Sequence, residues 1–61
     1  MSQREIEVLR LLARGLTNAQ IAEQLVISPR TVDAHLRSIY NKLAVMSRTT
    51  ATRYAIEHQL I

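Results

Sequence analysis

Side chains that can form paired hydrogen bonds gather on one face of a segment that begins near residue 29. Arginine can pair bidentately with guanine and asparagine with adenine, and a methyl-sized side chain can touch the methyl group of thymine. Read as a helix, the segment places such residues opposite its apolar stripe. They are Arg30, Ala34, Arg37 and Asn41, with Asp33 and Ser38 beside them. A helix face that is merely exposed to solvent would also be charged. This face alone therefore favours neither contact with bases nor simple solvent exposure.

The starts of two expected helices offer groups that bind phosphate. Free backbone N–H groups and the helix dipole attract anions there, and nearby hydroxyl and amide groups can add hydrogen bonds. The candidates are Thr17 and Asn18 at one start, Ser28 and Thr31 at the other, and Ser38 and Lys42 further along the second of these helices. Thr31 can equally form a local cap contact with Ser28, and both roles can coexist. For His35 we favour a packed histidine, hydrogen-bonded between two helices, over a phosphate contact.

Four helices are expected to position these groups, over about residues 3–14, 18–25, 29–43 and 48–58. Ser2 and Glu5 have the spacing of a capping box, and Gly15 supplies the left-handed residue that ends a helix at little cost. Ser28 caps the third helix, with Pro29 at its first position. The second helix is capped by Thr17 or Asn18, and the fourth by Ser47. No alternating period-two stretch of useful length exists, so we expect an all-α fold.

Apolar residues at helical spacing define a buried face on each expected helix. They are Val8, Leu9, Leu11 and Leu12, then Ile21, Ala22 and Leu25, then Val32, Leu36, Ile39 and Leu43, and finally Ala51, Tyr54 and Ala55. Only residues 26–28 join the second and third helices, and a link this short favours a crossing near a right angle. Ala22 provides the small residue that such a close approach needs. The spacing therefore favours a helix-turn-helix within a four-helix bundle over an ordinary three-helix bundle.

Length and composition limit the classes of function. The 61 residues form one domain at most, residues 1–61, and a chain this short has a thin core. A net charge of +3 and a pI near 10.2 permit a nucleic-acid partner without demanding one. There is no cysteine, no apolar run of membrane-spanning length and nothing resembling a signal peptide. We therefore expect a cytoplasmic protein that does not associate with a membrane.

An enzyme is not expected. Asp33, His35 and Ser38 combine the residue types of a catalytic triad, but on one helix they point in divergent directions and form no relay. The two histidines, His35 and His58, have no companion ligands for a metal, and no glycine-rich loop exists to hold phosphate. We expect no cofactor and no bound metal.

The sequence "REIEVLRLLARGLTNAQIAEQLVISPRTVDAHLRSIYNKL", residues 4–43, closely resembles the DNA-binding domain of the LuxR/FixJ (GerE-like) transcription regulators. The parts "REIEVL", "GLTNAQIA", "ISPRTVDAH" and "KL" follow one another with the spacing of that family. The resemblance implies sequence-specific binding to double-stranded DNA, with the third helix in the major groove and dimers on paired half-sites. It also implies the output domain of a longer regulator, such as a response regulator, with a receiver or ligand-sensing domain before it. RNA polymerase is a further partner that it allows.

The resemblance also assigns roles to individual residues. Asp33, Ala34 and Arg37 match the family's principal base-facing positions, and Thr17, Asn18, Ser28, Thr31 and Lys42 match its backbone-contacting positions. Glu5 or Glu7 would form an ion pair with Arg48 and tie the first helix to the fourth. Asp33 departs from the basic or amide residue common at its position. It could accept a hydrogen bond from a cytosine amino group, but helical spacing favours a pair with Arg37 four residues on.

The fourth helix offers a face on which two copies of the chain could pair. The residues that align there at i, i+3, i+4 and i+7, away from the expected core, are Thr49, Thr52, Arg53 and Ile56. A two-fold homodimer on DNA would explain Ile56, because the same short patch on two chains would meet itself. Otherwise Ile56 is a single exposed isoleucine, which is common, or it packs under Leu60 and Ile61.

Two other functions compete with this interpretation. A helix-turn-helix can serve as a protein-interaction module that does not bind DNA. A sigma-factor-like DNA-binding region shares the two-helix core, but the fourth helix after "KLAVMSR" favours the LuxR type. The salt dependence of binding distinguishes DNA binding from protein interaction, because binding through several phosphates weakens by orders of magnitude as the salt concentration rises.

Overall fold

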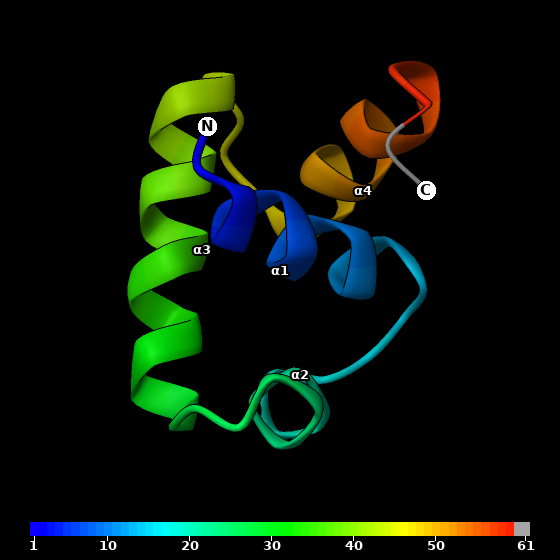
Figure 1. The fold of residues 1–61 in the computed structure, drawn as a ribbon. Helices are drawn as coiled ribbons and strands as arrows, with labels where there is room; N and C mark the ends of the chain where they lie inside the picture. Colours follow the sequence, from blue (N-terminus) through cyan, green and yellow to red (C-terminus); the bar gives the residue numbers. More distant parts are fainter. Residues whose placement is uncertain (60–61) are drawn as a thin grey trace.

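The computed structural model describes residues 1–59, which fold into four α helices and contain no strand (Figure 1). The helices are α1 (Gln3–Ala13), α2 (Asn18–Leu25), α3 (Pro29–Leu43) and α4 (Arg48–Glu57). The all-α fold is confirmed, and so are the bounds expected for α2 and α3. The other two helices each end one residue earlier than expected, because Arg14 and His58 are capping residues. None of the helices described is long and apolar enough to cross a membrane.

Side-chain caps fix the starts of these helices. The Ser2 hydroxyl accepts from the Glu5 backbone N–H at 3.2 Å, and the Glu5 carboxylate accepts from the Ser2 N–H at 2.9 Å, which confirms the expected capping box. Thr17 caps α2 and forms a second box with Gln20, whose side-chain oxygen accepts from the Thr17 N–H at 2.8 Å. This second box was not anticipated from the sequence. The caps of α3 and α4 are the hydroxyls of Ser28 and Ser47.

Left-handed residues follow the first three helices. Gly15, with a φ of 91°, was expected in this role, but Val26 and Ala44 adopt φ values of 56° and 55° without being glycine. A left-handed conformation costs an ordinary residue roughly 1–2 kcal/mol. A hydrogen bond of the Schellman type offsets this cost after α2, where the Ile27 N–H donates to the Ala22 carbonyl at 3.0 Å. Backbone hydrogen bonding therefore fixes the turn that leads into α3.

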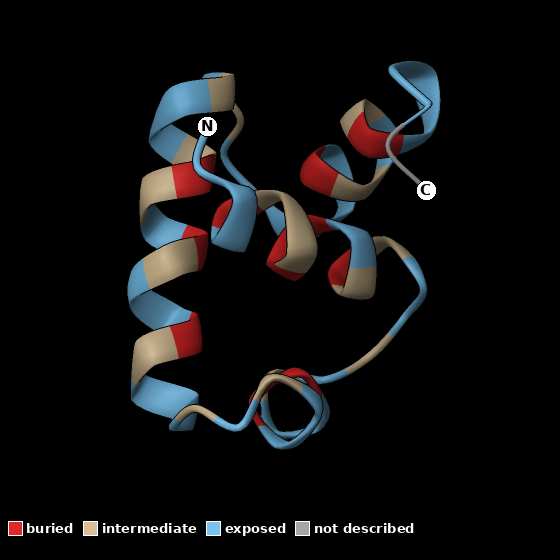
Figure 2. Cartoon of the chain, viewed as in Figure 1, coloured by how far each residue is buried: buried red, intermediate tan, exposed pale blue. Residues whose placement is uncertain are grey.

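The core is built from apolar residues of all four helices, and Figure 2 shows the buried positions in red on the inner sides of the ribbons. These residues are Val8, Leu9, Leu12, Ile21, Ala22, Val32, Leu36, Ile39, Ala51 and Ala55. The expected core faces are confirmed, except that Leu11, Leu25, Leu43 and Tyr54 are only partly buried. The core therefore anchors α3 by its inner face and leaves the outer face to solvent.

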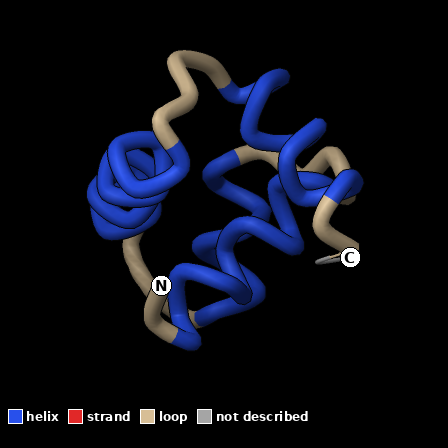
Figure 3. The backbone as a smooth tube through the Cα atoms, turned by 90° about the horizontal axis from the view of Figure 1, so that it is seen from above, coloured by secondary structure: helices blue, strands red, loops and turns tan. Residues whose placement is uncertain are grey.

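The helix-turn-helix is formed by α2 and α3, which contact each other across the short turn at residues 26–28. In Figure 1 α2 is seen end-on while α3 runs upright, so the two helices cross steeply, and Ala22 is buried as expected. α1 contacts each of the other three helices. Figure 3, seen from above, shows α3 along its own axis at one side of the molecule. This placement presents the outer face of α3 to a partner.

Candidate nucleic-acid interface

The outer face of α3 carries every residue that was predicted to read bases. All of these residues are exposed: Arg30, Asp33, Ala34, Arg37 and Asn41. The opposite side of the same helix is held in the core by Val32, Leu36 and Ile39, which are at most 4% exposed. Core packing needs none of the five outer side chains, so all five are accessible to a ligand.

A chain of side-chain hydrogen bonds joins α2, α3 and α4 beside this face. Nδ2 of Asn18 donates to Oδ1 of Asp33 at 2.5 Å, and Nη1 of Arg48 donates to Oδ1 of Asn18 at 2.8 Å. Nη2 of Arg48 also donates to the Leu16 carbonyl oxygen. We call Asn18, Asp33 and Arg48 the Asn18 network. It joins one predicted base-facing residue and one predicted phosphate-contacting residue to an arginine of the last helix.

The predicted ion pair between Arg48 and Glu5 or Glu7 is wrong. The Arg48 guanidinium is turned toward Asn18 and the loop after α1, where an amide oxygen and a backbone carbonyl accept its hydrogen bonds. Glu7 lies 3.8 Å from Arg4, one helical turn away along α1. The contact between the first and fourth helices therefore rests on apolar packing rather than on this ion pair.

The favoured pairing of Asp33 with Arg37 is also wrong. The Asp33 carboxylate accepts from Asn18, and neither of the two ion pairs within residues 1–59 involves Arg37. Helical spacing alone allowed the pair within α3, but the crossing of α2 brings an amide to the same carboxylate. The Arg37 guanidinium is left without an ion pair to any residue that the structure describes.

Glu5 is buried, with only 4% of its surface exposed, although it carries a charge. Its Oε1 accepts from Nζ of Lys42 at 2.7 Å and from the Ser2 N–H at 2.9 Å, and its Oε2 accepts from the Ser38 hydroxyl at 2.7 Å. We call Ser2, Glu5, Ser38 and Lys42 the Glu5 network. The Lys42 hydrogen bond, followed by those from the Ser2 N–H and Ser38, holds the pKa of the Glu5 carboxyl well below its ordinary value.

The Glu5 network was missed by reasoning from the sequence, although one signal was present. Glu5 lies four and seven residues before Leu9 and Leu12, so it shares their buried face on α1. Its network gives two predicted phosphate contacts an internal partner. Ser38 is partly buried, whereas Lys42 keeps 48% of its side chain exposed.

The helix starts hold their polar groups at or near the surface. Thr17 and Ser28 are exposed, whereas Thr31 is partly buried. The hydroxyls of Ser28 and Thr31 are hydrogen-bonded at 2.8 Å, so the local cap contact considered for Thr31 is confirmed. His35 is partly buried as expected, but no hydrogen bond of its ring is found within residues 1–59.

The two sides of α4 differ as predicted. Ala51 and Ala55 are buried, while Tyr54 is partly buried and stacks on the His58 ring with a centroid distance of 4.0 Å. On the opposite side Ile56 is 55% exposed. Its neighbours on that side are Thr49 and Arg53, which are exposed, and Thr52, whose hydroxyl donates to the Arg48 carbonyl at 3.0 Å. The alternative packing of Ile56 under Leu60 and Ile61 lies outside the described residues.

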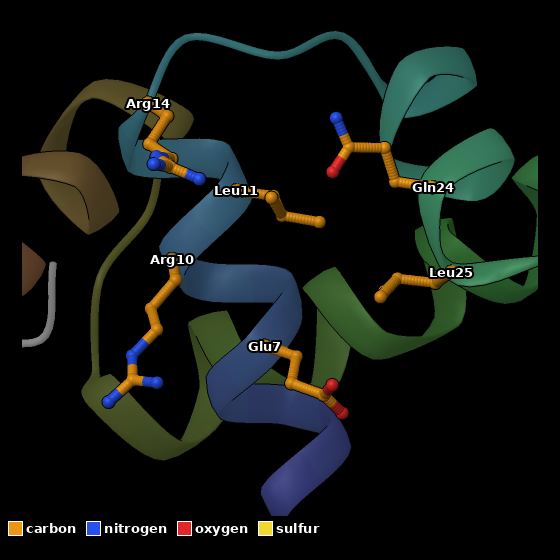
Figure 4. Close-up of a pocket in the computed structure, with 6 residues that line it drawn as sticks. All are labelled: Glu7, Arg10, Leu11, Arg14, Gln24 and Leu25. Atoms are coloured by element: carbon orange, nitrogen blue, oxygen red, sulfur yellow. The ribbon is translucent and has the colours of Figure 1, made fainter.

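Two of the surface depressions adjoin α1 or α3. One of about 240 Å³ lies beside the base-facing side of α3 and is lined by Asn18, Asp33, Leu36, Arg37, Tyr40 and Arg48. The other, of about 200 Å³, lies between α1 and α2, with Leu11 and Leu25 pointing toward each other and Arg10 pointing away (Figure 4). In the part of the chain that the structure describes, no group of histidines and carboxylates could hold a metal ion.

The chain is thus a helix-turn-helix domain with an exposed polar face on the second helix of the motif. It belongs to the luxR family of bacterial regulatory proteins, whose model matches residues 1–55. Fimbriae Z protein of Salmonella typhimurium is 44% identical to it over 61 residues, and response regulator protein VraR of Staphylococcus aureus is 43% identical over 61 residues. Each of these alignments covers 100% of this chain and 29% of the relative.

The fold agrees with this family. The crystal structure of the response regulator ChrA, from a heme-sensing two-component system, matches with a TM-score of 0.90 and 50% sequence identity. The match covers 98% of this chain and 30% of that chain. Helix-turn-helix domains of this family of response regulators imply DNA-binding transcription regulation.

Proposed function

We propose that α3 lies in the major groove of double-stranded DNA and reads its sequence. One observation carries this proposal: the exposed side chains of α3 form a single face opposite its buried stripe. A helix with its side chains is about 10–12 Å across, which matches a major groove about 12 Å wide. The base-facing residues are Arg30, Asp33, Ala34, Arg37 and Asn41.

Phosphate contacts fix the register of α3 on the duplex. The hydrogen bond between Asn18 and Asp33 holds the start of α2 beside the first turns of α3, so both helix starts serve the same side of the molecule. The phosphate-contacting residues are Thr17, Asn18, Ser28, Thr31 and Lys42. Ser38, predicted from the sequence for the same role, is not among them, because its hydroxyl donates its only hydrogen to Glu5. The Lys42 side chain is 48% exposed, so its ammonium contacts phosphate through hydrogens that Glu5 does not engage.

The chain acts as a homodimer on paired half-sites. Thr49, Thr52, Arg53 and Ile56 form the seam between two copies, which places the two α3 helices about one DNA turn, ~34 Å, apart. The chain is the output domain of a response regulator of the cytoplasm, with a receiver or ligand-sensing domain before it. Contact with RNA polymerase fits this role, and catalysis does not. The relatives named above are more than three times as long as this chain, which leaves room for such a domain.

The experiment selects duplexes from a random library and measures affinity as a function of salt. Sequence-specific binding predicts an enriched half-site and a steep fall in affinity as salt rises, with a slope set by the number of phosphate contacts. A helix-turn-helix that docks on proteins would enrich no sequence. If the selected duplexes bind no better than scrambled ones, reading of bases by α3 is disproved.

A further inference from the structure

The Asn18 side-chain amide joins a cation to an anion, and its two ends match their partners. Its oxygen accepts from Arg48 at 2.8 Å, and its nitrogen donates to Asp33 at 2.5 Å. Turning the amide over would place its donor group against the guanidinium and its oxygen against the carboxylate, which would remove both hydrogen bonds. The orientation of Asn18 is therefore fixed by Arg48 and Asp33 together.

Arg48 is itself held from two sides. It is the first residue of α4, and a positive charge is unfavourable at a helix N-terminus. Its guanidinium turns away along the loop after α1, where the Leu16 carbonyl accepts one hydrogen bond and Asn18 accepts another. A planar group bound at two points keeps one orientation, so Arg48 provides a fixed support for the Asn18 amide.

The Asp33 carboxylate has two oxygens, and only one of them accepts a hydrogen bond from a residue that the structure describes. Asn18 holds Oδ1, and no hydrogen bond or ion pair within residues 1–59 engages Oδ2. Asp33 is exposed on the base-facing side of α3. A carboxylate oxygen can accept a hydrogen bond from the amino group of cytosine in the major groove. Because Asp33 does not pair with Arg37, the two side chains can read separate bases.

We propose that Arg48 and Asn18 are positioning residues for base reading: they hold one oxygen of Asp33, which leaves the other to accept from a cytosine amino group. The inference rests on the proposed function, because it requires α3 to lie in the major groove. It makes α4 part of sequence recognition, although none of the predicted base-facing residues lies on that helix. The second hydrogen of the Asn18 amide stays available for phosphate, so both roles of Asn18 are compatible.

The test measures base preference with the 61-residue chain on duplexes that carry one half-site, varied one base pair at a time. Asp33→Ala identifies the base pair that Asp33 reads, as the position where discrimination is lost. Arg48→Met removes the guanidinium and keeps the length of the side chain. We expect it to lower discrimination at that same base pair about threefold to tenfold, as is usual for coupled neighbours. Discrimination at other positions stays unchanged.

The double variant of Arg48→Met and Asp33→Ala should discriminate no worse than Asp33→Ala alone. The matched control is Arg4→Met, which removes the same charge from an exposed residue whose ion pair with Glu7 is long, 3.8 Å. It should leave base preference as it is. If Arg48→Met fails to fold, Asn18→Asp replaces it, because it keeps an acceptor for Arg48 but places a second carboxylate against Asp33.

Three results would overturn the inference. The first is that Arg48→Met lowers the affinity for all duplexes equally and reduces the salt slope, which would make Arg48 a phosphate contact. The second is unchanged discrimination in Arg48→Met or in Asn18→Asp. The third is full additivity of the Arg48 and Asp33 changes. If Arg37→Ala abolishes base preference while Arg48→Met does not alter it, only this inference fails. If the unaltered chain prefers no base, the proposed function fails with it.

A measurement without DNA tests the arrangement separately. The Asn18 side-chain amide protons give their own signals in an NMR spectrum, and hydrogen bonding shifts them. Both Asp33→Ala and Arg48→Met should move these signals, whereas Arg4→Met should not. Unmoved signals in the first two variants would contradict the Asn18 network in the free protein, whatever the chain does on DNA.

Discussion

Two hydrogen-bond networks hold α3, and they differ in burial. The Glu5 network ties the C-terminal half of α3, through Ser38 and Lys42, to the start of α1. The Asn18 network ties the N-terminal half, through Asp33, to the starts of α2 and α4. Glu5 is 4% exposed, whereas Asp33 and Arg48 are both exposed.

This difference separates what each network does. A buried carboxylate needs its partners, because removing one leaves charged or polar groups unsatisfied away from water. Water can replace a lost partner in an exposed network, where a single hydrogen bond is worth about 0.5–1.5 kcal/mol. The Glu5 network therefore stabilises the fold, and the Asn18 network orients a side chain on the surface that we propose meets DNA.

The largest expected effect is a loss of thermal stability when the Glu5 network is removed. Glu5→Ala removes the acceptor of the partly buried Ser38 hydroxyl, of Lys42 and of the Ser2 N–H, and with it half of the capping box, so the midpoint of thermal unfolding should fall. The fall should exceed that of Asn18→Ala, measured by circular dichroism. Base preference should respond in the opposite way, because Asn18→Ala relaxes it and Glu5→Ala does not.

A control on the same helix sharpens this contrast. Glu7→Ala removes a glutamate that is about half exposed and whose partner Arg4 is 3.8 Å away. It should change stability by no more than about 0.5 kcal/mol. Equal destabilisation by Glu5→Ala and Glu7→Ala would mean that burial does not separate the two networks.

The next effect is on DNA binding through Arg37, in the middle of α3 between the residues that the two networks hold. Arg37→Ala should cost about 1–3 kcal/mol on the selected half-site and abolish the preference for it. The physical reason is the loss of a bidentate contact to a base edge. Titrations on selected and scrambled duplexes measure the effect. Equal losses on both would demote Arg37 to a phosphate contact.

Acid should act on the Glu5 network. The pKa of Glu5 is held below its ordinary value, mainly by the Lys42 hydrogen bond. A lowered pKa adds stability that is fully present above the unfolded value of about 4.3 and is lost as the pH falls through the folded value. Unfolding by denaturant from neutral to acid pH should show this loss. Glu5→Gln should flatten the curve in the acid range, and an unaltered curve would contradict it.

A smaller effect concerns the salt dependence of DNA binding. Lys42→Gln should lower the affinity for all duplexes alike and reduce the salt slope by about one at most, because Glu5 already neutralises part of the Lys42 charge. Affinities at several salt concentrations provide the measurement, on protein kept well below its unfolding temperature. A slope equal to that of the unaltered chain would remove Lys42 from the phosphate contacts.

The smallest effect is expected on the outer side of α4, the helix that also supplies Arg48 to the Asn18 network. Ile56→Glu should leave the fold and the affinity for one half-site unchanged, because Ile56 is 55% exposed. It should remove cooperative binding to a duplex with two half-sites, since a charge would enter the seam between two copies. Cooperative binding that survives this change would exclude this side of α4 as the seam.

The sequence alone predicted the helices, their caps and the face that each helix buries. These features depend on residues within one or two turns of each other, such as Ser2 with Glu5 or Ser28 with Pro29. The left-handed Val26 and Ala44 were not predicted, because backbone hydrogen bonds rather than a glycine allow them. The residues of α3 that were predicted to face bases were expected to be exposed, and they are.

Only the tertiary structure decided which charged and polar side chains pair. Arg48 was expected to pair with Glu5 or Glu7, and Arg37 with Asp33. In the structure Glu5 binds Lys42, 37 residues away, and Asp33 binds Asn18, 15 residues away. Several candidates of suitable charge existed for each acid, and local spacing could not rank them. The crossing of α2 over α3 and the packing of α1 against α3 bring one candidate within hydrogen-bond distance and keep the others away.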